Sequence, residues 1–173
     1  IGIPDSLPSS DYVFVIAGTI PNRKSTPVVD EWFGLHFSNG QFIGELSMEK
    51  VVSITGLGKS DKPNQNNIPP ERKIEAESLR ESAVSRAKEI FEGYCMDYKN
   101  KIGPLLDEEI DKLIELQDRH LSYQLSLFTS ERKKSEQERK VEKVFERFTD
   151  WVTDTLEIEN NPYLRIVAVF MGV

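Results

Sequence analysis

Residues 163–171 read YLRIVAVFM, a run of β-branched and aromatic side chains near the end of the chain. The turn signal Asn160–Asn161–Pro162 precedes the run, and Gly172 follows it. A bounded run of this length favours a strand over a short helix. Because apolar residues occupy both alternating faces, the pattern predicts a strand buried on both sides, with only Arg165 reaching solvent. We expect its neighbours to be the strand-like segments at the other end of the chain, in one sheet.

Composition sets the broad class. The chain has 173 residues, 38% hydrophobic and 29% charged, which predicts a soluble globular domain with one core. No apolar run approaches the roughly 20 residues of a membrane span. The single Cys95 excludes an internal disulfide, and with two histidines it leaves too few ligands for a structural zinc site. We therefore expect a reducing, cytoplasmic location, no metal and no cofactor. The start at Ile1 also suggests a part of a longer protein.

The β-rich part is expected over residues 12–55. Tyr12–Ile20 reads as an interior strand, because both of its faces are apolar. Alternation from Val29 to Phe37 and a second run from Phe42 to Leu46 flank Asn39–Gly40, which predicts a hairpin with a type I′ turn. His36 is expected to face outward on this hairpin. Residues 47–55 fit either a short capped helix or a fourth strand.

Residues 56–70 are rich in Gly, Ser, Asn and Pro, and this composition predicts a linker. Gly56–Leu57–Gly58–Lys59–Ser60 is superficially like a phosphate-binding loop. That loop requires glycine four residues before its Gly-Lys-Ser, and the corresponding position holds Ser53. The spacing therefore argues against nucleotide binding.

A helical arm is expected over residues 71–157. Its apolar stripes predict one helix over 71–101, a break at Gly103–Pro104, and a second helix up to Phe128. Residues 130–140 contain no apolar side chain, so they can be helical but not core. The stripe resumes after this segment, and we expect the helix to end near Glu157. No strict seven-residue repeat is sustained, which favours an intramolecular arm over a dimeric coiled coil.

The two tryptophans receive opposite expectations. Trp151 shares a helical face with Val144, Phe148 and Thr155, so we expect it to be a buried anchor between the arm and the sheet. Trp32 lies among polar residues of the hairpin and is expected to be less buried.

Together these signals predict a single α+β domain over residues 1–173. A small, mainly antiparallel sheet is closed by the C-terminal strand (162–173), and a long charged helical hairpin is inserted before that strand.

Charge limits the partners. The net charge is −7, which argues against strong independent binding to duplex nucleic acid. One basic cluster is the candidate contact for a partner or nucleic acid, and it consists of Arg132, Lys133, Lys134, Arg139, Lys140 and Lys143. Glutamates interleave with these cations, which is more typical of a solvated helix with ion pairs between successive turns. No sequence motif marks a catalytic residue.

The order of strands, linker, charged hairpin and final strand resembles a known region. With the segments FERFTDWVTDTL and NPYLRIVAVFMGV, residues 10–173 resemble the C-terminal accessory region of bacterial and archaeal Swi/Snf-type DNA-dependent ATPases, the RapA/HepA-like helicase-related proteins. The resemblance implies a non-catalytic tail that regulates or anchors the motor domains, with at most weak DNA contacts. Two alternatives stay open: a free-standing scaffold or protein-interaction domain with a coiled-coil-like arm, and an enzyme whose site the sequence does not reveal.

The terminal strand gives the first testable prediction. Deleting residues 163–173 should unfold the sheet, because the strand is expected to lie inside it. Thermal unfolding followed by circular dichroism measures this. A truncated protein that still melts cooperatively near the parent temperature would show that the strand is peripheral.

Overall fold

A computed structural model describes residues 1–172 except 4–6, 57–67 and 128. The chain divides into two compact units, which are described separately. The first unit holds the sheet and comprises residues 1–20, 29–95 and 161–173. The second comprises residues 21–28 and 96–160 and is mainly helical. Most of the predicted linker, including Leu57–Ser60 of the loop like a phosphate-binding motif, lies outside the described residues.

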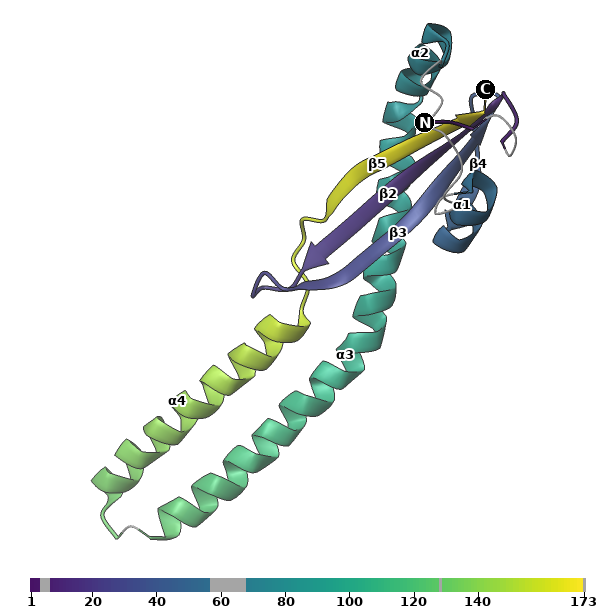
Figure 1. Ribbon diagram of the computed structural model, residues 1–173. Helices are drawn as coiled ribbons and strands as arrows, with labels where there is room; N and C mark the ends of the chain where they lie inside the picture. The colour runs from purple at the N-terminus through teal and green to yellow at the C-terminus, as the bar shows by residue number, and fades with distance from the viewer. Residues whose placement is uncertain (4–6, 57–67, 128, 173) are drawn as a thin grey trace. The chain divides into compact units, whose positions relative to one another are not determined.

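The predicted α+β class is confirmed. A five-stranded sheet has the order β1-β5-β2-β3-β4 (Figure 1). Its strands are β1 (Gly2–Ile3), β2 (Asp11–Pro21), β3 (Pro27–Ser38), β4 (Gln41–Ser47) and β5 (Tyr163–Gly172). The terminal strand β5 pairs antiparallel with β2, and β1 pairs in parallel with the last residues of β5. The sequence therefore predicted correctly that the two ends of the chain share one sheet.

The prediction that β5 is buried on both faces is confirmed only at the end of the strand, where the adjacent Phe170 and Met171 are 3% and 5% exposed, and it is wrong for the first part. Tyr163 is 65% exposed and Val167 is 43% exposed. The register between β5 and β2 shifts after the Val15–Ala168 pair, so that Ile16 pairs with Ile166. This bulge places an extra residue in β5 and changes which alternate side chains face which side of the sheet. From Tyr163 to Val167 the side chains alternate between exposed and half-buried, so the apolar residues at both alternating positions do not indicate two buried faces there.

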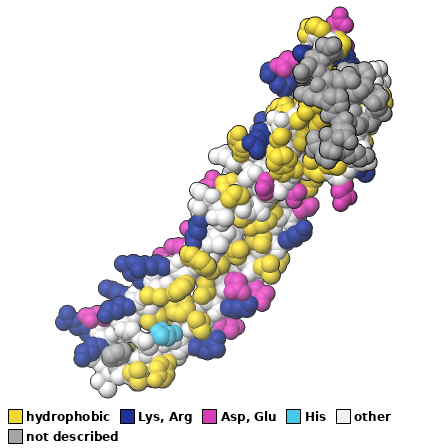
Figure 2. All heavy atoms as spheres, viewed as in Figure 1, with side chains coloured by type: hydrophobic (Ala, Val, Ile, Leu, Met, Phe, Trp, Pro, Cys, Tyr) yellow, Lys and Arg dark blue, Asp and Glu magenta, His cyan; other side chains and the backbone are white. Residues whose placement is uncertain are grey.

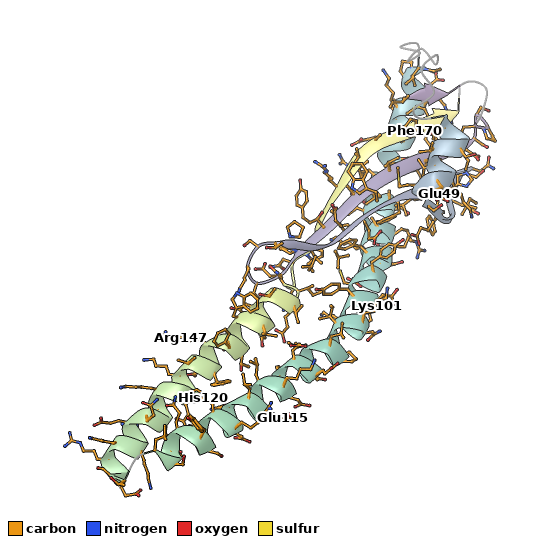
Figure 3. The ribbon with its side chains drawn as sticks, turned by 60° about the horizontal axis from the view of Figure 1, so that its bottom comes forward. Glu49, Lys101, Glu115, His120, Arg147 and Phe170 are labelled. Carbon is orange, nitrogen blue, oxygen red and sulfur yellow. The ribbon has the colours of Figure 1, made fainter. Side chains whose placement is uncertain are left out.

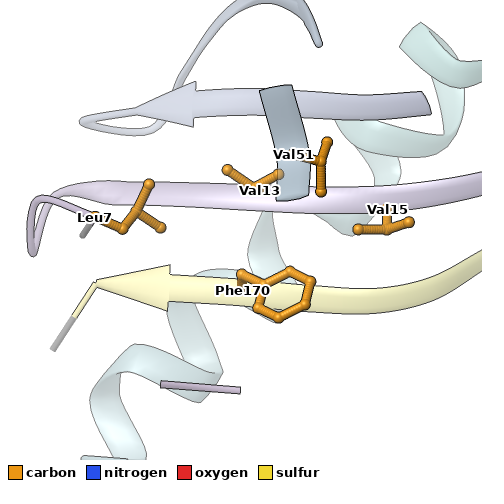
Figure 4. Close-up of a cluster of buried hydrophobic side chains, with 5 residues drawn as sticks. All are labelled: Leu7, Val13, Val15, Val51 and Phe170. Atoms are coloured by element: carbon orange, nitrogen blue, oxygen red, sulfur yellow. The ribbon is translucent and has the colours of Figure 1, made fainter. Parts of the chain in front are cut away.

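The two halves of β5 pack against different helices of the first unit. Leu164 and Ile166 line a small hollow with Ile16 and with Ala87 of helix α3 (Arg80–Ser126). Beyond the bulge, Phe170 joins a buried cluster with Leu7, Val13, Val15 and Val51, and Ala168 packs against this cluster (Figure 4).

The predicted hairpin is confirmed. Strands β3 and β4 pair antiparallel with Ser38 opposite Gln41. Asn39 and Gly40 both have positive φ, 49° and 78°, as a type I′ turn requires. The backbone amide of Asn39 also donates a hydrogen bond to the backbone carbonyl of Ser10 at 3.1 Å. The turn is thereby tied to the start of β2.

The ambiguity over residues 47–55 is resolved in favour of a helix, α1 (Met48–Thr55). The hydroxyl of Ser47 caps it by accepting from the amide of Lys50, and Gly56 ends it in the left-handed conformation with φ 65°. Val51 is fully buried against the sheet at Gly34, where an added Cβ would lie 2.4 Å from a Val51 methyl group. A glycine in β3 therefore makes room for α1.

The long helices begin with α2 (Pro70–Ser78) and α3 (Arg80–Ser126). The predicted break at Gly103–Pro104 is wrong, because α3 continues through Pro104. Proline removes one backbone hydrogen bond, to the carbonyl of residue 100. Asn100 is exposed, so water can satisfy that carbonyl. The interruption instead falls at Leu79, between α2 and α3.

Helix α4 (Glu131–Leu156) ends close to the predicted residue 157. In the second unit, the face of α4 that packs against α3 carries the buried Val141 and the half-buried Phe145 and Val152. Trp151 is 57% exposed, so the prediction that it is a buried anchor is wrong. Trp32 is also exposed, but at 44% it is more buried than Trp151, so the predicted order of the two tryptophans is wrong.

The turn between β2 and β3 lies within residues 21–28 of the second unit and is organised by a buried Asn22. The side-chain oxygen of Asn22 accepts from the amides of Lys24 (3.0 Å) and Thr26 (2.9 Å). Its side-chain nitrogen donates to the carbonyl of Thr155 (2.8 Å) near the end of α4. Arg23 adds an ion pair with Glu157 at 2.7 Å. This loop therefore closes over the C-terminal end of α4.

Close packing at Gly18 gives a prediction for the first unit. A Cβ there would lie 2.4 Å from the Phe91 ring and 2.8 Å from a Leu164 methyl group. Gly18→Ala should therefore lower the free energy of unfolding by about 1–3 kcal/mol. Urea denaturation measures this loss.

The matched control is Gly44→Ala in β4, where an added Cβ meets no atom within 4 Å. It should be neutral or slightly stabilising, because glycine weakens a strand interior. Equal stabilities for the two variants would contradict the packing of Phe91 on Gly18.

Candidate functional site

A buried carboxylate at the start of β2 collects three polar side chains of the first unit. One oxygen of Asp11 accepts hydrogen bonds from the hydroxyls of Ser10 and Ser38, both at 2.7 Å. The other lies 2.8 Å from Nε2 of His36. Burial alone would raise the pKa of Asp11, but the hydrogen bonds from Ser38, Ser10 and His36 outweigh it and hold that pKa below its ordinary value.

This cluster contains the residue types of a serine hydrolase triad but not its arrangement. In a triad the serine hydroxyl bonds to histidine, and the carboxylate bonds to the far side of that histidine. Here the hydroxyl of Ser38 donates to the carboxylate itself, so it is not placed to transfer its proton to His36. The cluster ties the ends of β2 and β3 together. The sequence analysis missed it, because Asp11 and His36 lie on different strands.

A polar pocket lies beside this cluster, between the start of β2, the Asn39–Gly40 turn and α2. It encloses about 340 Å³. Its lining consists of Ser10, Tyr12, Asn39, Gly40, Arg72, Glu75, Ser78 and Leu79.

The charged groups of this pocket already bind one another. The hydroxyl of Tyr12 and the guanidinium of Arg72 both donate to the Glu75 carboxylate, the latter at 2.7 Å. Arg72 also donates to the carbonyl of Gly172 at 3.1 Å and lies 4.3 Å from the centre of the Tyr12 ring. Burial and the bond to Glu75 raise the pKa of Tyr12 to about 12, so its phenol stays protonated near neutral pH. The pocket therefore presents no free base.

The described residues include no group of three or more His, Cys, Asp and Glu side chains placed to hold a metal ion. Within the same residues, no helix is long and apolar enough to cross a membrane.

The six predicted contact cations lie on α4, but they do not converge. Arg132 pairs with Glu136 at 3.4 Å, and Lys134 pairs with Glu131 at 3.0 Å. The other four are exposed, and none has a carboxylate within ion-pair distance among the described residues. These four are Lys133, Arg139, Lys140 and Lys143.

Helix periodicity places most of these cations in two rows. Arg132, Arg139 and Lys143 form an outer row, opposite the face that packs against α3. Lys133 and Lys140 share a row with Arg147, which the sequence analysis did not include; Figure 3 shows Arg147 on α4. The cations are therefore divided between two rows of α4.

An exposed apolar stripe adjoins the second row. Val144, Phe148 and Trp151 are 47%, 54% and 57% exposed. We define the α4 flank as this stripe together with Lys133, Lys140 and Arg147. Hydrophobic side chains cover much of the visible face of the hairpin in Figure 2. The sequence showed a wide apolar stripe on this helix, but a single partner helix buries only the part that faces it.

Comparison of the chain with protein-family models, with curated proteins and with solved structures finds no match.

The Asp11 cluster predicts a pH dependence of stability. A carboxyl whose pKa is lower in the folded than in the unfolded state stabilises the fold above its unfolded pKa. That stability is lost as the pH falls through the folded pKa. The free energy of unfolding should therefore fall as the pH drops below about 4, near the ordinary pKa of aspartate.

Asp11→Asn should lower the free energy of unfolding at pH 7 by about 1–3 kcal/mol and reduce its decline in acid. Urea titrations from neutral to acidic pH measure both effects. The control is Asp111→Asn on the exposed surface of α3. An unchanged acid profile in Asp11→Asn would contradict the role assigned to this carboxylate.

Proposed function

We propose that the chain is a non-catalytic accessory module of a Swi/Snf-type DNA-dependent ATPase and that it works through protein contacts made by its helical hairpin. The observation that carries the proposal is the exposed apolar stripe of α4. Three large apolar side chains on one helix face, bordered by cations, are typical of a surface that binds another protein. The sequence resemblance supplies the candidate partner, the motor domains of the parent ATPase.

The charge distribution supports a protein partner over DNA. Seven basic and five acidic residues alternate over residues 131–147, and the cations are divided between two rows of α4. Affinity for duplex DNA depends on several cations reaching successive phosphates. Mixed charges around an apolar surface instead set the orientation and association rate of a protein partner.

A free-standing interaction domain is the second candidate, and the same exposed stripe favours it. The two candidates differ in the sequence that precedes Ile1 in the full-length protein, since motor motifs there would identify the first. The proposed location for both is the cytoplasm, in keeping with the single cysteine.

The functional prediction concerns the isolated chain. It should show no ATP hydrolysis and only weak, salt-sensitive binding to duplex and single-stranded DNA. Added to the motor domains of a parent ATPase that lacks this region, it should change their DNA-dependent ATPase rate. Fluorescence anisotropy with labelled DNA at near-physiological salt and a phosphate-release assay measure these quantities.

Two results would replace this proposal. Submicromolar DNA binding that is lost on charge reversal at Lys133, Lys134, Arg139 and Lys140 would make the hairpin a nucleic-acid clamp. ATP turnover by the isolated chain would make it an enzyme.

A further inference from the structure

We propose that the α4 flank binds an acidic amphipathic helix of the partner protein. This inference rests on the proposed function as a protein-interaction module and specifies the chemistry of the surface that the module recognises. Three observations carry it: the exposure of the apolar stripe, the row of cations beside it, and the lack of any ion pair between these cations and the described carboxylates.

The apolar stripe has the spacing that a helix recognises. Val144, Phe148 and Trp151 are separated by four and three residues, so they lie on one side of α4 over two successive turns. Each is about half exposed, while the neighbouring Val141 is buried. A helix laid along this stripe would bury all three side chains in the manner of a helix-in-groove complex.

The stripe has a cationic border. Lys133, Lys140 and Arg147 recur every seven residues and therefore follow the stripe along one side. None of the three forms an ion pair among the described residues. In the loop of the second unit, the Lys24 ammonium lies 4.4 Å from the centre of the Trp151 ring, which adds a fourth cation at the end of the row.

Most acidic residues of α4 lie away from this border or pair with other cations. With about 3.6 residues per turn, Glu131, Glu138 and Glu142 fall on the opposite flank of the helix. Glu136 lies next to Lys133 and Lys140 but pairs with Arg132 at 3.4 Å, and Asp154 pairs with Arg23 at 3.8 Å. Asp150, three residues after Arg147, lies toward the outer row. The cationic border therefore favours negative charge locally, although the chain carries −7 overall. Screening limits the influence of the more distant carboxylates to about 8–10 Å at physiological salt.

A second copy of the chain complements this surface poorly. Helix periodicity places Leu105, Leu116 and Tyr123 of α3 on the same side of the hairpin as the α4 stripe, and all three are exposed. The border of these α3 residues carries Lys101, Lys112 and Arg119 beside Glu108 and Glu115. Lys112 pairs with Glu108 at 2.8 Å within the same helix. A second hairpin would therefore bring no surplus of negative charge to the cations of α4.

The test uses the full chain carrying Trp32→Phe, which leaves Trp151 as the sole tryptophan. The probe is a synthetic, tryptophan-free amphipathic helix with leucines along one stripe and glutamates on its borders. Binding should shift the Trp151 emission to shorter wavelength, because the helix removes the indole from water. The matched control peptide has lysine in place of each glutamate and should bind at least about tenfold more weakly.

Variants of α4 separate the two rows of cations. Charge reversal of Lys133, Lys140 and Arg147 to glutamate should weaken the acidic peptide at least about tenfold. The same change at the outer row, Arg132, Arg139 and Lys143, alters the net charge equally and should leave binding within about twofold. Phe148→Ala should also weaken binding, and circular dichroism verifies that each variant remains folded.

Three outcomes would overturn the inference: equal binding of the acidic and basic peptides, equal effects of the two charge reversals, or a stable dimer in light scattering that dissociates on Phe148→Glu. The last would make a second copy the occupant. The proposed function is tested separately from this inference, by the effect of the chain on the ATPase rate of the motor domains. An unchanged motor rate alongside specific peptide binding would leave the recognised surface intact but assign it to another partner.

Discussion

The pairing of β5 with β2 is the constraint on which the sheet unit depends. Tyr163 lies opposite Thr19, and Met171 lies opposite Tyr12, so the strand crosses almost the whole length of β2. The chain leaves the sheet after β4 and forms all its helices before β5 completes the sheet. A contact between residues so far apart in sequence has a high loop-closure cost, which burial of the central strand must offset. β2 is accordingly the most buried strand of the sheet.

Because of the bulge, β5 packs against α3 with one part of its length and against α1 with the other while it stays paired with β2. Before the register shift, Leu164 and Ile166 lie with Ala87 of α3. After it, Ala168 and Phe170 lie with Val51 of α1. Without the extra residue, these four side chains of β5, Leu164, Ile166, Ala168 and Phe170, would all face the same side of the sheet. The glycines at positions 18 and 34 admit Phe91 and Val51 at close range, so the helices approach the sheet where side chains are absent.

The helical unit follows a different constraint, because a helix with a single partner buries only one stripe. Helix α4 uses Val141, Phe145 and Val152 for its packing. Val144 and Trp151 lie to one side of that contact and Phe148 lies at its edge, and all three side chains remain exposed. Exposed apolar surface of this kind lowers the solubility of a protein, and in natural proteins it commonly marks a site that a partner covers. The proposed role in protein recognition rests on this exposed stripe of α4 and its cationic border.

The sequence by itself determined the fold class, the hairpin at Asn39–Gly40, the pairing of the two chain ends and the helical nature of the arm. These features follow from local periodicity and turn chemistry, which neighbouring residues set. Only the tertiary structure decided three others. The bulge in β5 depends on its register against β2, the continuity of α3 through Pro104 depends on exposure of the freed carbonyl, and the Asp11–His36 contact joins two strands. The exposure of Trp151 belongs with them, because an apolar stripe predicts that a helix face seeks burial but does not say how much of that face its partner covers.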